Sequence, residues 1–385
     1  MDTLPTELID SILEHIYYDK GKPQRTTLKA CASISRAWRE PSQRLLFRTV
    51  SLGSGLHGRP AHISFCEATG PETEHGRLLG QHVRVLEVYV GEKSGADLDD
   101  ADLADILSRT PRLHELALQV AAVYRFSLQA MEDLIHLATN GYTSRRDPSL
   151  TPIPLRVRSL AILSCGIQSP ILYQLLQIWP CVEFLYLGVE VAAPPPKWTP
   201  TFRLYQLTLM RMPRFAILSW LLSSSAESLR IASFRDAPGR EVDPLLEEIG
   251  PRLRSLRLMN YNLRATAILK YCPNLEELVI VQLSTLFKLD NLPRGLEHLS
   301  CRNLPAEDQS LGLVIQAVGE LSRLRVVTCA AGAAQDERFG ELLELCESKK
   351  VELCVDQVPF WVREDSVYVD RFPRSKAVAN FALMN

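Results

Sequence analysis

The chain has 385 residues, of which 46% are hydrophobic and 23% charged, the proportions of an ordinary globular protein. Its 43 basic and 45 acidic residues nearly cancel, so charge gives no reason to expect a nucleic-acid partner. No stretch reaches the roughly 18 consecutive apolar residues of a membrane-spanning helix. The acidic residues among the first fourteen also exclude a secretion signal. We therefore expect neither a nucleic-acid nor a membrane partner.

The nine cysteines are scattered along the chain and odd in number. Several fall within apolar runs, namely Cys181, Cys272, Cys301 and Cys329. Such cysteines are typical of small buried side chains in a reducing compartment. The sequence therefore favours a cytoplasmic or nuclear location.

Two apolar stretches near the N-terminus predict helices, residues 4–18 (LPTELIDSILEHIYY) and residues 27–40 (TLKACASISRAWRE). The first has two neighbouring ladders of apolar residues at i+4 spacing, Leu4, Leu8, Ile12 and Ile16 beside Ile9 and Leu13. The second has a stripe at i+3 and i+4 spacing, Leu28, Cys31, Ile34 and Trp38. The first helix is apolar around nearly half its circumference, more than one partner helix can cover. The pattern alone leaves two equal alternatives, packing on the following repeat or binding to another protein.

Residues 51–80 are rich in glycine and polar residues, which indicates a linker or a first irregular repeat. Within them, GSGLHG (53–58) matches the G-x-G-x-x-G pattern of phosphate-binding loops. A phosphate site also requires a helix that starts at the motif, and the next residues show no amphipathic run. We therefore interpret this motif as linker composition.

From residue 81 onward a phrase of the form L-x-x-L-x-L recurs. Its first apolar position, here called the anchor, occurs at Val83, Leu113, Val157, Val182, Leu204, Leu229, Leu253, Leu275, Leu296 and Leu324. Successive anchors are 21 to 30 residues apart, except for one interval of 44 that suggests an insertion around RRDPSLTPIP. Most of these intervals match the period of roughly 20–29 residues that leucine-rich repeats show.

The alternation at the end of each phrase predicts a short strand with one buried face, and helix-like stretches lie between the phrases. We therefore predict an α/β fold in which residues 81–358 form a curved leucine-rich-repeat solenoid. Its parallel strands would line the concave face and its helices the convex face. A doubly wound α/β domain is the alternative, but its strands are usually continuous apolar runs and its units are longer. Residues 359–385 are predicted to be a C-terminal cap or tail.

The segments LPTELIDSIL, TLKACASISRAW and RLLF (44–47), in this order and spacing, resemble the three-helix F-box, particularly its fungal form. The resemblance covers about residues 3–50, so residues 1–50 are assigned as the F-box. An F-box followed by leucine-rich repeats is a known architecture. Ile34 replaces the usual valine of the family, and the connector 17–27 is longer and more basic than the common one.

The resemblance implies that the module docks on the adaptor Skp1 and, through it, joins a cullin-based ubiquitin ligase. Carried over position by position, it assigns Skp1 binding to Leu4, Pro5, Leu8, Ile9, Ile12, Leu13, Cys31, Ile34 and Trp38, the last three from the second helix. Aliphatic anchors with a tryptophan are a common composition for an interface hot spot.

The sequence contains no G-x-x-x-x-G-K-[ST] phosphate-binding loop, no H-E-x-x-H zinc motif and no G-x-S-x-G hydrolase motif. It also lacks the paired C-x-x-C of a zinc module, and the cysteines show no activating context. The histidines are dispersed, and we expect His114 and His298 at the surface of repeat strands. No active site, metal or cofactor is therefore expected, and the chain is not predicted to be an enzyme.

A substrate protein would bind the concave face, where residues flanking the buried leucines are expected to point. Phe184 and Tyr186 are candidates to hold an apolar or extended peptide, and Arg235, Arg257 and Arg302 are candidates to bind carboxylates or phosphates. The same face is expected to carry Glu115, Ser255, Glu277 and His298.

The leading hypothesis is a non-catalytic substrate-recognition subunit of a Skp1–cullin–F-box ubiquitin ligase. In the second hypothesis the repeats form a scaffold that binds Skp1 without cullin. A third, an enzyme that uses the loop 53–58, has no further motif to support it.

Overall fold

The protein is described here from a computed structural model that covers residues 4–17, 24–52, 61–91, 98–141, 153–282, 288–303 and 310–356. The predicted tail 359–385 and the motif 53–58 lie outside these described residues. The chain divides into two compact units, Met1–Val182 and Glu183–Asn385. Each unit is considered by itself.

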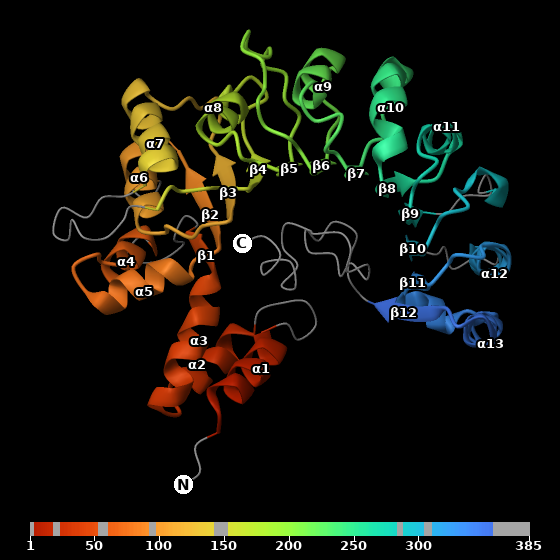
Figure 1. The fold of residues 1–385 in the computed structure, drawn as a ribbon, viewed down its shortest axis with the longest axis horizontal. Coiled ribbons are helices and arrows are strands. Elements are labelled where there is room, and N and C mark those ends of the chain that lie inside the picture. The colour runs from red at the N-terminus through yellow and green to blue at the C-terminus, as the bar shows by residue number, and fades with distance from the viewer. Residues whose placement is uncertain are drawn as a thin grey trace. The chain divides into compact units, whose positions relative to one another are not determined.

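The first unit begins with three helices and continues with alternating strands and helices (Figure 1). Its helices are α1 (Thr6–Tyr17), α2 (Arg25–Ala32), α3 (Arg36–Arg48), α4 (Ala61–Ala68), α5 (Glu74–His82), α6 (Asp100–Ser108), α7 (Leu128–Asn140) and α8 (Ile171–Ile178). Its strands are β1 (Thr49–Leu52), β2 (Val85–Val90), β3 (Glu115–Val120) and β4 (Ser159–Ser164). They pair in parallel and in chain order.

The second unit repeats a strand, a turn and usually a helix. Its strands are β5 (Phe184–Leu187), β6 (Gln206–Leu209), β7 (Ile231–Phe234), β8 (Ser255–Asn260), β9 (Glu277–Gln282), β10 (His298–Asn303), β11 (Val326–Ala330) and β12 (Glu352–Asp356). Its α-helices are α9 (Phe215–Leu222), α10 (Asp243–Ile249), α11 (Leu263–Tyr271), α12 (Ser310–Glu320) and α13 (Phe339–Lys349). The described residues also include the 3-10 helices η2 (Arg240–Val242), η3 (Gly250–Arg252), η4 (Leu289–Asn291) and η5 (Ala331–Gln335).

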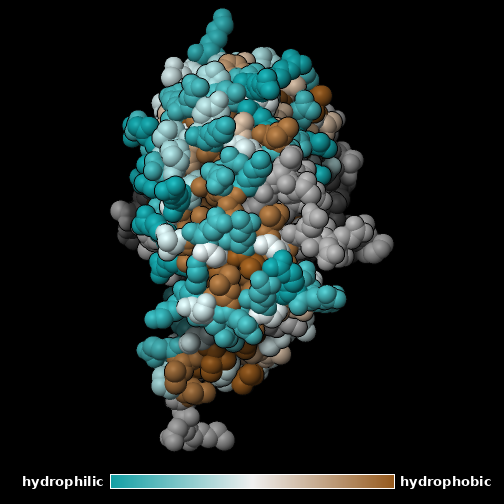
Figure 2. Space-filling view, turned by 90° about the vertical axis from the view of Figure 1, so that its right-hand side faces the viewer, coloured by the Kyte–Doolittle hydropathy of each residue, from teal (hydrophilic) through white to brown (hydrophobic). Residues whose placement is uncertain are grey.

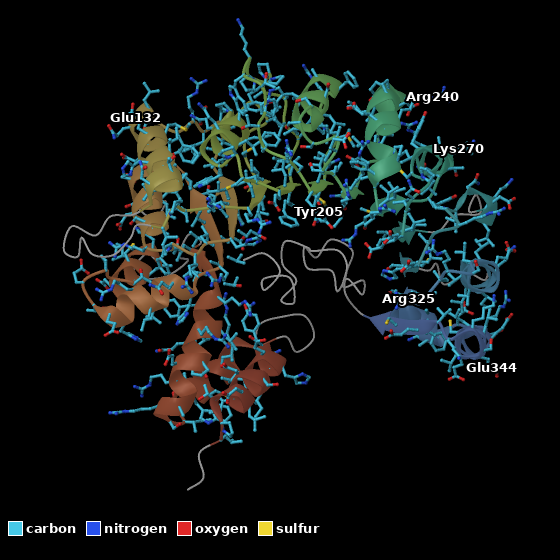
Figure 3. All side chains as sticks on the ribbon, viewed as in Figure 1. Glu132, Tyr205, Arg240, Lys270, Arg325 and Glu344 are labelled. Carbon is cyan, nitrogen blue, oxygen red and sulfur yellow. The ribbon has the colours of Figure 1, made fainter. Side chains whose placement is uncertain are left out.

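Within the second unit all strand pairs are parallel and in chain order. The strands follow an arc, and the helices lie on its outer side (Figure 1). Exposed charged residues on the helices, such as Lys270 and Glu344, lie on that outer side as well (Figure 3). The predicted arrangement of strands inside and helices outside is therefore confirmed for this unit.

The ten predicted anchors are confirmed. Each of the strands β2 to β11 begins two residues after its anchor, and every anchor side chain is at most 6% exposed. Two further strands, β1 and β12, are not among the ten that the leucine phrases predict. Their sequences, TVSL and ELCVD, lack the leucine phrase, so neighbouring strands rather than a strong local pattern account for their pairing.

The stretch 61–82 is not a plain linker, because it contains α4 and α5. Its glycines fit packing rather than flexibility. A Cβ atom at Gly80 would lie 2.1 Å from the carbonyl oxygen of Arg109, and one at Gly76 would lie 2.2 Å from that of Gly70. The glycines that suggested a linker are instead required because only glycine allows the backbones to approach this closely. The next helix, α4, begins at Ala61, after the motif 53–58.

His114 lies in the interior of the first unit, which contradicts its predicted surface position. It directly precedes β3, and its backbone N–H donates to the carbonyl oxygen of Arg84 at 2.9 Å. Burial lowers the pKa of His114 to about 4, although Glu115 acts in the opposite direction, and Arg158 and Arg84 lower it further. The imidazole is therefore neutral in the folded state at neutral pH.

The first prediction concerns the row of buried side chains that runs in register across neighbouring strands and includes Leu207, Leu256, Leu278 and Leu299. Leu256 of β8 is fully buried, so Leu256→Ala should remove packing and leave a cavity, costing about 2–5 kcal/mol. Leu263, at the start of α11, is 73% exposed, and Leu263→Ala should change the stability by less than about 0.5 kcal/mol. Urea denaturation of both variants tests this, and equal midpoints would contradict the inferred row.

The second prediction concerns pH. The unfolded chain binds a proton at His114 near pH 6.5, whereas the folded chain does so only near pH 4. Above about pH 6.5 His114 is neutral in both states and its contribution to the free energy of unfolding is fully present. As the pH falls towards 4, protonation favours the unfolded state and the free energy of unfolding decreases by on the order of 3 kcal/mol. Denaturation of His114→Gln at several pH values should show a flatter dependence. The exposed His136 provides the control, since His136→Gln should keep the wild-type slope.

Candidate functional site

The three N-terminal helices have their own hydrophobic core. Its buried members are Ile9, Leu13, Tyr17, Leu28, Cys31 and Leu45, and Ile16, Trp38 and Leu46 pack against them partly buried. Each helix contributes to this cluster, so α1, α2 and α3 form one packed module within the first unit. The three-helix arrangement matches the prediction.

The second apolar stripe does not lie on one helix. Helix α2 ends at Ala32, and Ser35 is extended (φ −160°, ψ 173°) before α3 begins at Arg36. The two serines around Ile34 favour a helix boundary, because serine competes with helical hydrogen bonding. Ile34 therefore lies in the turn and Trp38 in α3, and their predicted placement on the second helix is wrong.

Five of the nine predicted docking residues are exposed. Their exposed fractions are 48% for Leu4, 51% for Leu8, 42% for Ile12 and 63% for Ile34, and Pro5 is exposed as well. We call these five residues the N-terminal apolar surface. Hydrophobic side chains gather at the bottom of Figure 2, where the module lies. Isolated exposed leucines are common, but Leu8 and Ile12 lie one turn apart on α1 and Leu4 directly precedes that helix, so together they mark a candidate interface.

Three other predicted docking residues face inward. Ile9, Leu13 and Cys31 belong to the core of the module and are at most 8% exposed, so they do not meet a partner in this conformation. Trp38 is half-buried and packs against the same core. The periodicity could not separate the two ladders of α1, because the direction of the core depends on where α2 and α3 pack.

The module joins the first strand through polar contacts. Helix α3 passes directly into β1. The hydroxyl groups of Tyr17 and Thr49 are 3.0 Å apart, and Arg25 Nη2 donates to the Thr49 carbonyl at 3.2 Å. Leu8 and Ile12 of α1 are 51% and 42% exposed, so the first repeat does not cover them, which argues against the alternative that the excess apolar surface packs on the following repeat.

The predicted substrate-binding residues lie in different environments. Phe184 is buried, with its ring centroid 5.8 Å from that of Tyr205, so it belongs to the core and its predicted role is wrong. Tyr186 and Arg257 are half-buried, whereas Arg235 is exposed beyond the end of β7. Arg302 lies on β10, but its side chain is outside the described set. No shared site of these five residues is therefore established.

A buried polar ladder occupies the strand face of the second unit. Ser255 donates to one oxygen of Glu277, whose other oxygen lies 3.1 Å from Nδ1 of His298. Nε2 of His298 lies 2.9 Å from Oγ1 of Thr328. In the first unit, Ser159 similarly donates to Glu115 at 3.1 Å. The polar residues expected to face a substrate therefore bond to one another across strands.

The order hydroxyl, imidazole and carboxylate in this ladder also occurs in hydrolases. The four residues of this ladder, Ser255, Glu277, His298 and Thr328, are at most 3% exposed, so a substrate has no access to the hydroxyl group of Thr328. The predicted surface position of His298 is wrong. The described residues also contain no group of three or more His, Cys, Asp or Glu that could hold a metal ion.

The thiols do not have the properties of nucleophiles. Burial raises the pKa of Cys272 to about 12 and that of Cys165 to about 11. Burial, followed by the nearby Asp105, raises the pKa of Cys66 to about 11. A catalytic cysteine needs a lowered pKa. No disulfide joins any of the nine cysteines, all of which lie in the described ranges.

Within the described ranges, every helix falls short of the length and apolar character needed to cross a bilayer.

Comparison with known proteins adds little to these observations. No family model and no curated protein matches the chain. Among solved structures, it is similar to an internalin from Listeria monocytogenes, with 12% identity and a TM-score of 0.32, over 88% of this chain and 91% of that one. At these values the similarity supports no functional inference.

The class of the protein follows from its own repeats. Parallel strands that alternate with helices, each strand preceded by a buried anchor, define a leucine-rich-repeat-like fold. Repeat arrays of this kind present extended surfaces that bind other proteins.

The third prediction concerns the polar ladder. Glu277→Ala should leave Ser255 and His298 buried without their partner and cost about 3 kcal/mol. Glu227 is exposed and pairs with Arg252, so Glu227→Ala should cost less than about 1 kcal/mol. Thermal and urea denaturation measure both costs. If the two variants were equally stable, the ladder would have no structural role.

Proposed function

We propose that the chain is a non-catalytic substrate-recognition subunit of a Skp1–cullin–F-box ubiquitin ligase. In this role the N-terminal module binds the adaptor Skp1, and the repeats hold a protein substrate for ubiquitination. The contribution to rate is proximity, because the substrate is held near the enzyme that carries ubiquitin. Such a role places the chain in the cytoplasm or nucleus.

The observation that carries the proposal is the N-terminal apolar surface. The module has a core of its own, yet Leu8 and Ile12 on one side of α1, and Leu4 just before it, remain exposed. Burying one such side chain contributes about 1.5–3 kcal/mol, so a partner that covers three gains substantially. The resemblance of residues 3–50 to the F-box names the partner that fits this surface.

The raised pKa values of three thiols fit recognition rather than thioester catalysis at those residues. A ligase that forms its own thioester needs a reactive cysteine, whereas burial raises the pKa of Cys66, Cys165 and Cys272. A substrate-recognition subunit needs only two binding surfaces and a firm connection between the docking module and its repeats. Helix α3, which continues into β1, provides such a connection within the first unit.

The fourth prediction tests adaptor binding. Leu8→Asp combined with Ile12→Asp places two charges on the surface without changing the module core, and should weaken binding to purified Skp1 by at least about 100-fold. Leu128→Asp is the matched control, since Leu128 is 85% exposed at the start of α7 and should bind normally. Trp38→Ala is less suitable because Trp38 also supports the core. Affinities come from titration calorimetry of the full chain, with circular dichroism to check the fold.

Unchanged binding by the double variant, or no binding by the wild type, would overturn the proposed adaptor surface. A second measurement adds cullin to the wild-type complex. Assembly of the three proteins supports the ligase, whereas a Skp1 complex that excludes cullin rejects it in favour of the scaffold.

A further inference from the structure

The second unit has a cavity of about 390 Å³ at the carboxyl ends of β7 and β8. It is lined by the connection that follows β7, including Arg235, Asp236 and Pro238, and by Leu258 and Met259 of β8. Ligand pockets commonly range from about 300 to 1,000 Å³, so this cavity suits one or two side chains of a bound peptide.

The wall of the cavity is held in place by Arg264 of α11. Its Nη2 donates to the carbonyl oxygen of Gly239 at 2.6 Å, and its Nε donates to that of Pro238. The same guanidinium pairs with Asp243 of α10 and, mainly through that hydrogen bond, lowers the pKa of the carboxyl group. The loop is therefore tied to two helices and the cavity exists before any ligand binds.

The charges around the cavity do not balance. Arg264 is paired with Asp243, and Asp236 lies 3.7 Å from Arg211. Arg235 is exposed, and its side chain makes no hydrogen bond or ion pair with the residues that the structure describes. One guanidinium therefore remains available at the rim of a preformed cavity.

The other side of the cavity is apolar. Leu258 is buried, and Met259 is half-buried and packs against Val279 and Val281 of β9. Phe234 and Leu258 pair in register, so Arg235 and Met259 follow as the next residues of adjacent strands. The backbones that carry a charged and an apolar side chain thus lie about one strand spacing apart, roughly 5 Å.

We propose that this cavity binds an acidic side chain of a partner protein, a carboxylate or a phosphate, together with an adjacent aliphatic side chain. Arg235 forms the charge-assisted hydrogen bonds, which are stronger than neutral ones. Met259 contacts the aliphatic group. The inference deepens the proposed function, since it gives the class of segment that the repeats recognise, but its test does not require the adaptor.

The fifth prediction tests this site with the full chain and four short peptides in protein-observed NMR or calorimetry. The probes are acetyl-Gly-Leu-Glu-Gly-amide, the same peptide with phosphoserine in place of Glu, and two controls with Gln or Ser there. We expect the wild type to bind an acidic peptide at least about tenfold more tightly than its neutral control. The tighter of the two acidic peptides identifies the natural group as a carboxylate or a phosphate.

Arg235→Gln should remove this preference, whereas Arg240→Gln should keep it, because Arg240 lies outside the cavity on the helix side (Figure 3). Equal binding of acidic and neutral peptides, or a preference that survives Arg235→Gln, overturns the proposed site. Loss of adaptor binding with retained peptide preference would reject the proposed function alone.

Discussion

The fold depends on one constraint, that each strand carries a hydrophobic row which its neighbours must help to bury. In the second unit this row passes in register through Leu207, Ala232, Leu256, Leu278, Leu299 and Val327, all fully buried. Because side chains alternate along a strand, a slip of one residue would turn the row outward. The register therefore fixes every position on the strand face, including those of the polar ladder and of Arg235.

The sequence predicted strand positions correctly where the local apolar pattern coincides with burial. All ten strands that the phrases predict are present, and each begins two residues after its anchor, because that aliphatic side chain is buried in the core. It did not predict the exposure of side chains whose burial depends on residues distant in the sequence. Phe184 and Arg235 both flank buried residues, yet the first lies within a strand and packs against Tyr205, whereas the second follows a strand end. Glycines such as Gly80 were misread because their close contact lies 29 residues away, at Arg109.

The same distinction applies to the N-terminal module. Its identity as an apolar helical unit was evident from periodicity, but two ladders on α1 gave no indication of which one faces the core. Packing resolves this, with Ile9 and Leu13 inside and Leu8 and Ile12 outside. The sequence placed Ser255, Glu277 and His298 on one face of the strands but did not predict that they bond to one another and to Thr328, because the four residues come from separate repeats and only the register brings them together.

The passage from α3 into β1 has a consequence for how such a protein is dissected. Within the described residues β1 pairs only with β2, so its other edge would offer backbone groups to foreign strands if it were bare. Arg25 and Tyr17 contact Thr49 at that edge, which makes the module an end cap for the array. Deleting residues 1–48 to isolate the repeats would thus leave the edge of β1 unpaired. Proteins recovered with the fragment would include some that bind this edge non-specifically. Charged point substitutions at Leu8 and Ile12 keep the cap in place and therefore test the N-terminal apolar surface alone.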